Sequence, residues 1–200
     1  RRFGKSITAS MLSAYYSVGE DTRDLFSKFK IYESPDFTRY LNKYNVISLD
    51  IASLTGKAGN AANMLTYLKQ NVLGELKALY PHIVFDSTAP LSVNLAKIYN
   101  QTENQFIVII DEWDCLFREY PDDTETQNAY INFLRDLFKS DESKSFIVLA
   151  YLTGILPIKK YNNESALNNF DEFTMINPSP LEEYVGFTED EVKQLCNVHG

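Results

Sequence analysis

Apolar side chains recur every three or four residues in several stretches of the chain, a spacing that predicts amphipathic helices. Residues 5–16 are the first such stretch, and residues 60–80 are the longest, ended by Pro81. The apolar stripe of the longer stretch comprises Ala61, Leu65, Leu68, Val72, Leu76 and Leu79. Both helices are therefore expected to pack one face against a core.

Further stretches also have a helical pattern. Residues 90–100 begin with Pro90, which suits the first turn of a helix. Residues 126–139 place aromatic and aliphatic side chains on one side. Near the end of the sequence, Thr188 can cap a helix, and Glu191 can complete a capping box. Helical patterns are thus predicted along the whole chain.

Apolar runs without helical spacing lie between these helices and predict strands. Residues 46–51 (VISLDI) are rich in branched side chains. Residues 106–111 (FIVIID) and 146–154 (FIVLAYLTG) are almost continuously apolar, which is typical of strands buried on both faces. A last short strand is predicted at residues 173–176 (FTMI).

The alternation of strand and helix patterns indicates an α/β domain over residues 1–200, with a parallel sheet covered on both sides. In such sheets, ligands bind at the carboxyl ends of the strands. The residues directly after each predicted strand are therefore the first candidates for a functional site.

The tripeptide Gly4-Lys5-Ser6 matches the second half of a phosphate-binding loop, Gly-x-x-x-x-Gly-Lys-[Ser/Thr]. The first half is absent, so we expect an N-terminally truncated domain that lacks its first strand. A chance tripeptide is the alternative. The position of Gly4-Lys5-Ser6 directly before a predicted helix favours a phosphate site, because the N–H groups and dipole of a helix N-terminus attract anions.

Asp111 and Glu112 follow a run of aliphatic residues, which is the Walker B pattern. An Asp at a strand end can hold Mg²⁺, and the next carboxylate can face the terminal phosphate and polarise an attacking water. The alternative is that the two acidic residues only end a strand. Their position after the lysine motif favours a nucleotide site.

Thr153 and Gly154 follow the second apolar run. In nucleotide hydrolases that insert a strand between the lysine strand and the aspartate strand, this position ends the sensor strand. Thr153 would then lie between Lys5 and Asp111 and could hydrogen-bond the terminal phosphate or the water. Capping of the strand end by the hydroxyl is the alternative, and the sequence does not decide between them.

Other residues near the strand ends suit structural roles. Asp50 ends the first predicted strand, and Asp114 can orient the turn or the water molecules around Mg²⁺. Trp113 is expected in the core or at an interface. Surface solvation is the expected role of three further cations, Arg135, Lys159 and Lys160.

ATP suits the sequence better than GTP. Residues 42–45 (NKYN) resemble the guanine-reading motif Asn-Lys-x-Asp but lack its aspartate, and they precede the 46–51 strand. The stretch therefore lies too early in the sequence for a guanine-reading motif, and guanine recognition is not expected.

Composition excludes several classes of protein. A formal net charge of -8 disfavours a general nucleic-acid surface. Cys115 and Cys196 lie far apart and outside any Cys-x-x-Cys pair, which disfavours a disulfide framework or a zinc site. No apolar run approaches the length of a membrane span. We therefore expect a reduced, cytoplasmic protein.

Taken together, motifs in a fixed order resemble the bacterial AAA-ATPase-like family. These blocks are Arg1-Arg2-Phe3-Gly4-Lys5-Ser6, Val46-Ile47-Ser48-Leu49-Asp50, Ile109-Ile110-Asp111-Glu112-Trp113-Asp114, Leu152-Thr153-Gly154-Ile155 and Gly186-Phe187-Thr188-Glu189-Asp190-Glu191-Val192. They span almost the whole chain, which makes the resemblance more specific than either Walker motif alone.

The resemblance implies a three-layer α-β-α P-loop NTPase fold with a parallel sheet of order 5-1-4-3-2. It implies that Gly4, Lys5 and Ser6 bind the nucleotide phosphates, and that Ser6 and Asp111 bind Mg²⁺. Glu112 and Thr153 are the catalytic candidates. Trp113 stands where family members usually have Tyr. Many members carry a restriction-endonuclease-like nuclease domain after this one, and no such domain lies within the sequence.

Two functions fit these observations. The first is ATP binding and Mg²⁺-dependent hydrolysis that drives a conformational change in a larger bacterial protein. The second is a non-hydrolysing, nucleotide-gated regulatory or scaffold module. Glu112 favours the first function, because a degenerate switch often loses its base. ATP is the expected partner, and no direct contact with nucleic acid is expected from this domain.

Overall fold

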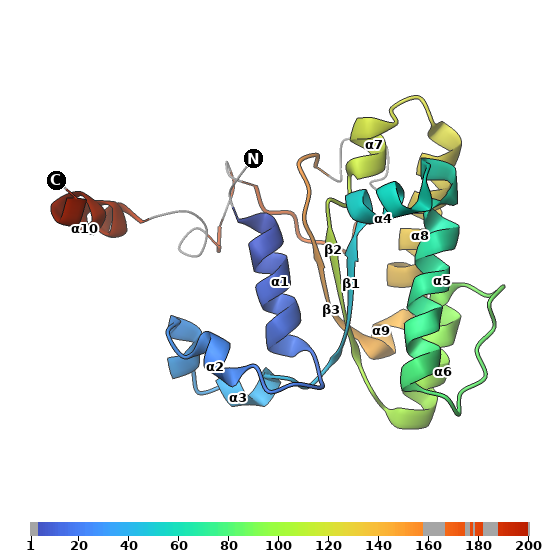
Figure 1. Cartoon of the computed structure of the whole chain (residues 1–200), viewed down its shortest axis with the longest axis horizontal. Coiled ribbons are helices and arrows are strands. Elements are labelled where there is room, and N and C mark those ends of the chain that lie inside the picture. Colours follow the sequence, from blue (N-terminus) through green and yellow to red (C-terminus); the bar gives the residue numbers. More distant parts are fainter. Residues whose placement is uncertain (1–3, 158–166, 175–176, 178, 182–187, 200) are drawn as a thin grey trace.

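The computed structural model describes residues 4–157, 167–174, 177, 179–181 and 188–199. Within these residues, a three-stranded parallel sheet carries helices on both faces (Figure 1). The α/β architecture with a parallel sheet agrees with the sequence prediction and is compatible with a P-loop fold.

The strands are β1 (Asn45–Asp50), β2 (Phe106–Asp111) and β3 (Ile147–Leu152), in the spatial order β1-β2-β3. Both pairings are parallel, and β2 lies in the centre. Every residue of β2 is buried because the strand has a neighbour on each edge and helices on each face.

The expectation that both apolar strands are covered on both faces is wrong for β3. No position of β3 is fully buried, and Val148 and Leu149 are 45% and 38% exposed. In the part of the chain that the structure describes, β3 pairs with β2 alone. An edge strand of this kind keeps apolar residues in contact with solvent despite its uniform composition.

One face of the sheet is covered by α1 (Lys5–Tyr16). Ala9 of α1 packs against Ile107 and Ile109 of β2. Beyond the C-terminal end of α1, a small aromatic cluster around Tyr15 forms a satellite core with three short helices. These are α2 (Arg23–Phe26), the 3-10 helix η1 (Lys30–Glu33) and α3 (Phe37–Tyr40).

The opposite face carries the larger layer of helices. They are α4 (Ile51–Ala58), α5 (Ala61–Leu79), α6 (Leu91–Thr102), α7 (Cys115–Glu119), α8 (Thr124–Lys139) and α9 (Ser143–Phe146). Val108 and Ile110 of β2 belong to the main core on this side. Successive β2 side chains therefore alternate between the α1 layer and the main core, as the pleat of a strand requires.

The long helical patterns are confirmed as α1, α5, α6 and α8. Pro90 is the N-cap of α6 and thus precedes the first turn that the sequence suggested. The capping box is confirmed at α10 (Glu189–His199), where the Thr188 N–H donates to the Glu191 carboxylate at 2.8 Å. Phe173 and Thr174 are not in a strand, and residues 175–176 lie outside the described residues.

No helix among the described residues has the length and apolar character needed to cross a membrane.

Candidate functional site

The carboxyl ends of the parallel strands form one edge of the sheet, and the polar candidates gather there. Asp50 and Asp111 are register partners across β1 and β2. The Thr153 N–H donates to the Ile110 carbonyl at 2.9 Å. The structure therefore brings together the residues that follow all three strands.

Asp111 ends β2 on the face that α1 covers. Its side chain follows Ile107 and Ile109 in the alternation along the strand, and these two contact the α1 layer. Burial, and next the Asp111 carboxylate, raise the pKa of Tyr151, which packs in the same layer. One Asp111 oxygen accepts the Glu112 N–H at 2.9 Å. No lysine or arginine among the described residues pairs with Asp111.

Glu112 has a left-handed backbone with φ 52°. A positive φ is uncommon for a residue other than glycine. The chain leaves β2 through this residue and enters α7 shortly afterwards. The Glu112 carboxylate forms an ion pair with Arg118 of α7. Glu112 thus lies at the end of β2, as predicted, with its carboxylate directed to a cation that the sequence analysis did not single out.

Asp114 is the buried centre of the turn after β2. Its side chain is 0% exposed, and one carboxylate oxygen accepts Arg118 Nε–H at 3.1 Å. The same oxygen accepts the N–H groups of Ile155 and Leu156 at 3.0 and 2.8 Å. Of the two expected roles for Asp114, the structure shows orientation of the turn.

Trp113 and Gly154 pack against each other and join the turn to the end of β3. The Trp113 N–H donates to the Thr153 carbonyl at 3.0 Å. A Cβ atom at Gly154 would lie 2.6 Å from a Trp113 ring carbon and 2.7 Å from an Asp114 oxygen. Trp113 is buried and its ring packs on Phe117, so the expected core position is observed.

Thr153 is buried at the end of β3, and its hydroxyl has no hydrogen-bond partner in the described part of the chain. The backbone N–H and C=O of Thr153 secure the strand end, whereas the hydroxyl does not cap it. A buried hydroxyl of this kind is usually paired, so its free state fits a ligand or water partner.

The N-terminus of α1 is open in a way that suits an anion. Gly4 is the N-cap with φ 76°, no side chain caps the helix, and its first turn holds no acidic residue. Three other helix N-termini, those of α4, α5 and α8, are closed by the side chains of Asp50, Asn60 and Asp123. Lys5 is partly buried and Ser6 is exposed. The uncapped N–H groups and the lysine together form a positive end.

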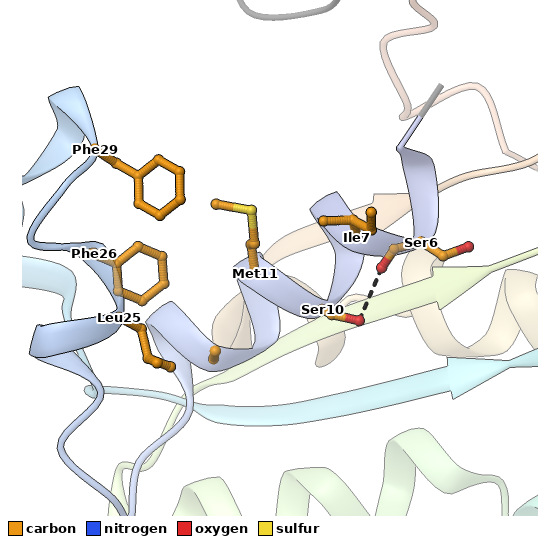
Figure 2. Close-up of a pocket in the computed structure, with 8 residues that line it drawn as sticks. Ser6, Ile7, Ser10, Met11, Leu25, Phe26 and Phe29 are labelled. Carbon is orange, nitrogen blue, oxygen red and sulfur yellow. Dashed lines mark hydrogen bonds between the residues drawn. The ribbon is translucent and has the colours of Figure 1, made fainter. Parts of the chain in front are cut away.

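A groove of about 380 Å³ runs along the outer side of α1 (Figure 2). Ser6 and Ser10 supply its polar lining, and the Ser10 hydroxyl donates to the Ser6 carbonyl at 2.9 Å. The remaining lining is apolar and comprises Ile7, Met11, Ala14, Leu25, Phe26 and Phe29. An apolar lining of this kind does not suit phosphate.

The remaining candidates have structural contacts or lie outside the described residues. Asp50 caps α4 through the Ser53 N–H at 2.9 Å, which is the structural role expected for it. The Asn42 amide donates to the Ala14 and Ser17 carbonyls and fixes the loop after α1. Arg135 is exposed on α8 and bonds Asn132. Lys159 and Lys160 lie outside the described residues.

No group of three or more His, Cys, Asp or Glu side chains arranged for a metal ion was found among the described residues. Burial and the nearby Glu119 carboxylate raise the pKa of Cys115 to about 12, so its thiol stays protonated and is not a nucleophile.

Arg118 is the charged residue at this edge that sequence reasoning missed. Its position four residues after Asp114 is the one signal in the sequence, because residues at this spacing on a helix face each other. Its contact with Glu112 carries no such signal, because Glu112 lies outside α7.

The sequence model of the family described as predicted AAA-ATPase, named AAA-ATPase-like, matches residues 1–162. The chain belongs to the AAA-ATPase-like family. No curated protein and no solved structure matches it. Membership of the AAA-ATPase-like family suggests nucleotide binding and ATPase activity in general.

Proposed function

We propose that this domain binds ATP with Mg²⁺ and hydrolyses it, and that hydrolysis drives a conformational change in a larger protein. One observation carries the proposal: Asp111 lies on the same face of the sheet as α1, whose N-terminus is uncapped. In a member of the AAA-ATPase-like family, this pairing of an open helix end with an acidic strand end supports a phosphate and metal site.

The phosphates would bind at the N-terminus of α1. The N–H groups of Gly4, Lys5 and Ser6 are the backbone donors, and the Lys5 ammonium supplies the compensating charge. The absence of any acidic side chain in the first turn supports this assignment, since a carboxylate there would repel the ligand.

Ser6 and Asp111 would hold Mg²⁺, which neutralises phosphate charge when it is bound. Asp111 fits this role because the residue is only 9% exposed, and its carboxylate accepts a backbone N–H and lacks a paired cation among the described residues. A buried carboxylate with no cation partner is costly, and a metal ion would remove that cost.

Glu112 and Thr153 would act on the attacking water. Glu112 would accept the proton of the water as general base. Thr153 would hydrogen-bond the water or the terminal phosphate through its unpartnered hydroxyl. Both residues follow neighbouring strands, so they would reach the ligand from the same edge of the sheet.

For the sheet, we propose the order 5-1-4-3-2, in which β1, β2 and β3 are strands 2, 3 and 4. The free edge of β3 would then receive the strand that leads into Gly4. We further propose that residues 1–200 are one P-loop domain of a cytoplasmic protein, joined in some members of the family to a nuclease domain.

The competing function is a nucleotide-gated module that does not hydrolyse ATP. The observation in its favour is the ion pair between Glu112 and Arg118, which occupies the carboxylate that would act as the base. Hydrolysis by the full-length protein separates the two functions.

The test is phosphate release by full-length protein with ATP, with and without Mg²⁺. We expect Glu112→Gln to slow turnover at least about a hundredfold, since a positioned base contributes roughly 10²–10⁴ in rate. ATP binding should be at least as tight, because the variant removes a negative charge near the phosphates. Glu125→Gln, at an exposed position on α8, is the matched control. If the parent protein shows no Mg²⁺-dependent turnover, the proposal of hydrolysis fails and the non-hydrolysing regulatory function remains.

A further inference from the structure

The Glu112 carboxylate and the proposed phosphate site belong to opposite layers of the molecule. Asp111 and α1 share one face of the sheet. Arg118, the partner of Glu112, lies on α7, whose residues Cys115 and Leu116 are buried in the main core of the other face. The contact with Arg118 therefore draws Glu112 toward the α7 layer, away from α1.

The guanidinium of Arg118 is held by a buried carboxylate, that of Asp114. Its Nε–H donates to Asp114, whose side chain is fully buried, while a different nitrogen, Nη2, contacts Glu112. Asp114 is held in turn by the N–H groups of Ile155 and Leu156. A residue anchored in this way cannot follow Glu112 if the glutamate moves, so movement of Glu112 must break the contact.

We propose that Arg118 is a positioning residue that holds Glu112 in a resting position, and that ATP hydrolysis requires Glu112 to leave Arg118. This inference rests on the proposed function and adds a regulation of the same site. In the ion pair the carboxylate is held at Arg118 of α7, away from the α1 layer where the phosphates would bind. The contact thus lowers basal turnover through the position of Glu112.

The same contacts connect Arg118 to the segment directly after β3. Asp114 joins Arg118 to residues 155 and 156, which come directly after Thr153 and Gly154. A ligand that moves the end of β3 would act on Asp114 and hence on Arg118. Release of Glu112 would then follow nucleotide or partner binding at this edge.

The experiment compares Arg118→Lys with parent in full-length protein. Lysine keeps a positive charge beside Asp114 but lacks the planar fork that serves two carboxylates at once. We expect kcat for ATP to rise about threefold to tenfold with KM unchanged, because a partly exposed ion pair is worth a few-fold in an equilibrium. Arg135→Lys, which changes the same residue type on exposed α8, should leave kcat unchanged.

A double-mutant cycle separates positioning from general damage to the fold. In a Glu112→Gln background, Arg118→Lys should have no effect on kcat, because the residue that it acts through is gone. Melting temperatures of all variants are measured in parallel. An equal fall of kcat in both backgrounds, or an unchanged kcat in Arg118→Lys, overturns the inference while parent turnover keeps the proposed function.

A structural comparison of parent protein keeps the inference testable if the lysine variant unfolds. Crystals of full-length protein without nucleotide should retain the Glu112–Arg118 contact. Crystals with Mg²⁺ and a non-hydrolysable ATP analogue should show it broken, and a retained contact overturns the inference. If the parent binds no ATP at all, the proposed function fails and the inference fails with it.

Discussion

Two regions at the carboxyl edge of the sheet are built in opposite ways. The turn after β2 is joined to the end of β3 by backbone and side-chain hydrogen bonds centred on Asp114. The N-terminus of α1, by contrast, has no side-chain cap, and Lys5 has no ion pair among the described residues. The first region is assembled without a ligand, whereas the second leaves its donors unused.

The two regions separate stability from binding. Asp114 and Trp113 of the turn have hydrogen-bond partners within the protein, so their loss should damage the fold. Among the described residues, the start of α1 has no side-chain cap and Lys5 has no ion pair, so loss of the Lys5 side chain should damage binding alone. Substitutions in the two regions test this contrast when their effects on the free energy of unfolding are compared.

The largest loss of stability is expected for Asp114→Ala. The variant leaves the Ile155 and Leu156 N–H groups without an acceptor and removes the buried partner of Arg118. A donor left unpaired costs about 1–3 kcal/mol when it is buried, and these two donors are partly buried, so we expect a combined loss of about 3 kcal/mol in urea unfolding. Asp136→Ala, at an exposed position on α8, is the control. Equal stability of the two variants would contradict the contrast.

A smaller loss is expected for Gly154→Ala. The added Cβ would meet the buried Trp113 ring at 2.6 Å, so the ring or the backbone must shift. Overpacking of this kind costs about 1–3 kcal/mol. Gly74→Ala is the matched control, because a Cβ at this helical glycine meets nothing within 4 Å. The control should be neutral or stabilising. Equal stability of the two variants would contradict the prediction, because the Trp113 ring would then move aside at no cost in free energy.

The smallest change in stability is expected for Lys5→Ala, within about 0.5 kcal/mol of the parent, as is usual for surface positions. ATP binding should nevertheless weaken about tenfold to a hundredfold, because a hydrogen bond to a charged group contributes about 1.5–3 kcal/mol. Calorimetry of full-length protein measures the affinity, with Lys57→Ala of α4 as an exposed control. Unchanged affinity in Lys5→Ala would remove the anion site from the start of α1.

The main strands and long helices could be predicted from the sequence because apolar runs and helical spacing are local signals. The central run FIVIID became the buried strand β2 of a parallel sheet, as predicted. The run that became β3 has the same apolar character but lies at an edge. Composition reports how apolar a strand is, and not how many neighbours it has.

The site was predictable only in part, for a related reason. Asp111, Glu112 and Thr153 follow strands, so the topology of a parallel sheet places them at one edge. The contact of Arg118 with Glu112 depends on the left-handed turn at Glu112, which no propensity indicates for glutamate. The one-turn helices around residues 23–40 were missed because so few residues carry no periodicity.

The free edge of β3 bears on how this protein behaves at high concentration. Within the described residues, β3 pairs on one side only, and it carries the exposed side chains of Val148 and Leu149. An edge strand of this kind is a template on which another extended chain can add, so copies of the domain could join edge to edge and aggregate. An extended segment that covers β3 in the full-length protein would therefore also keep the copies apart.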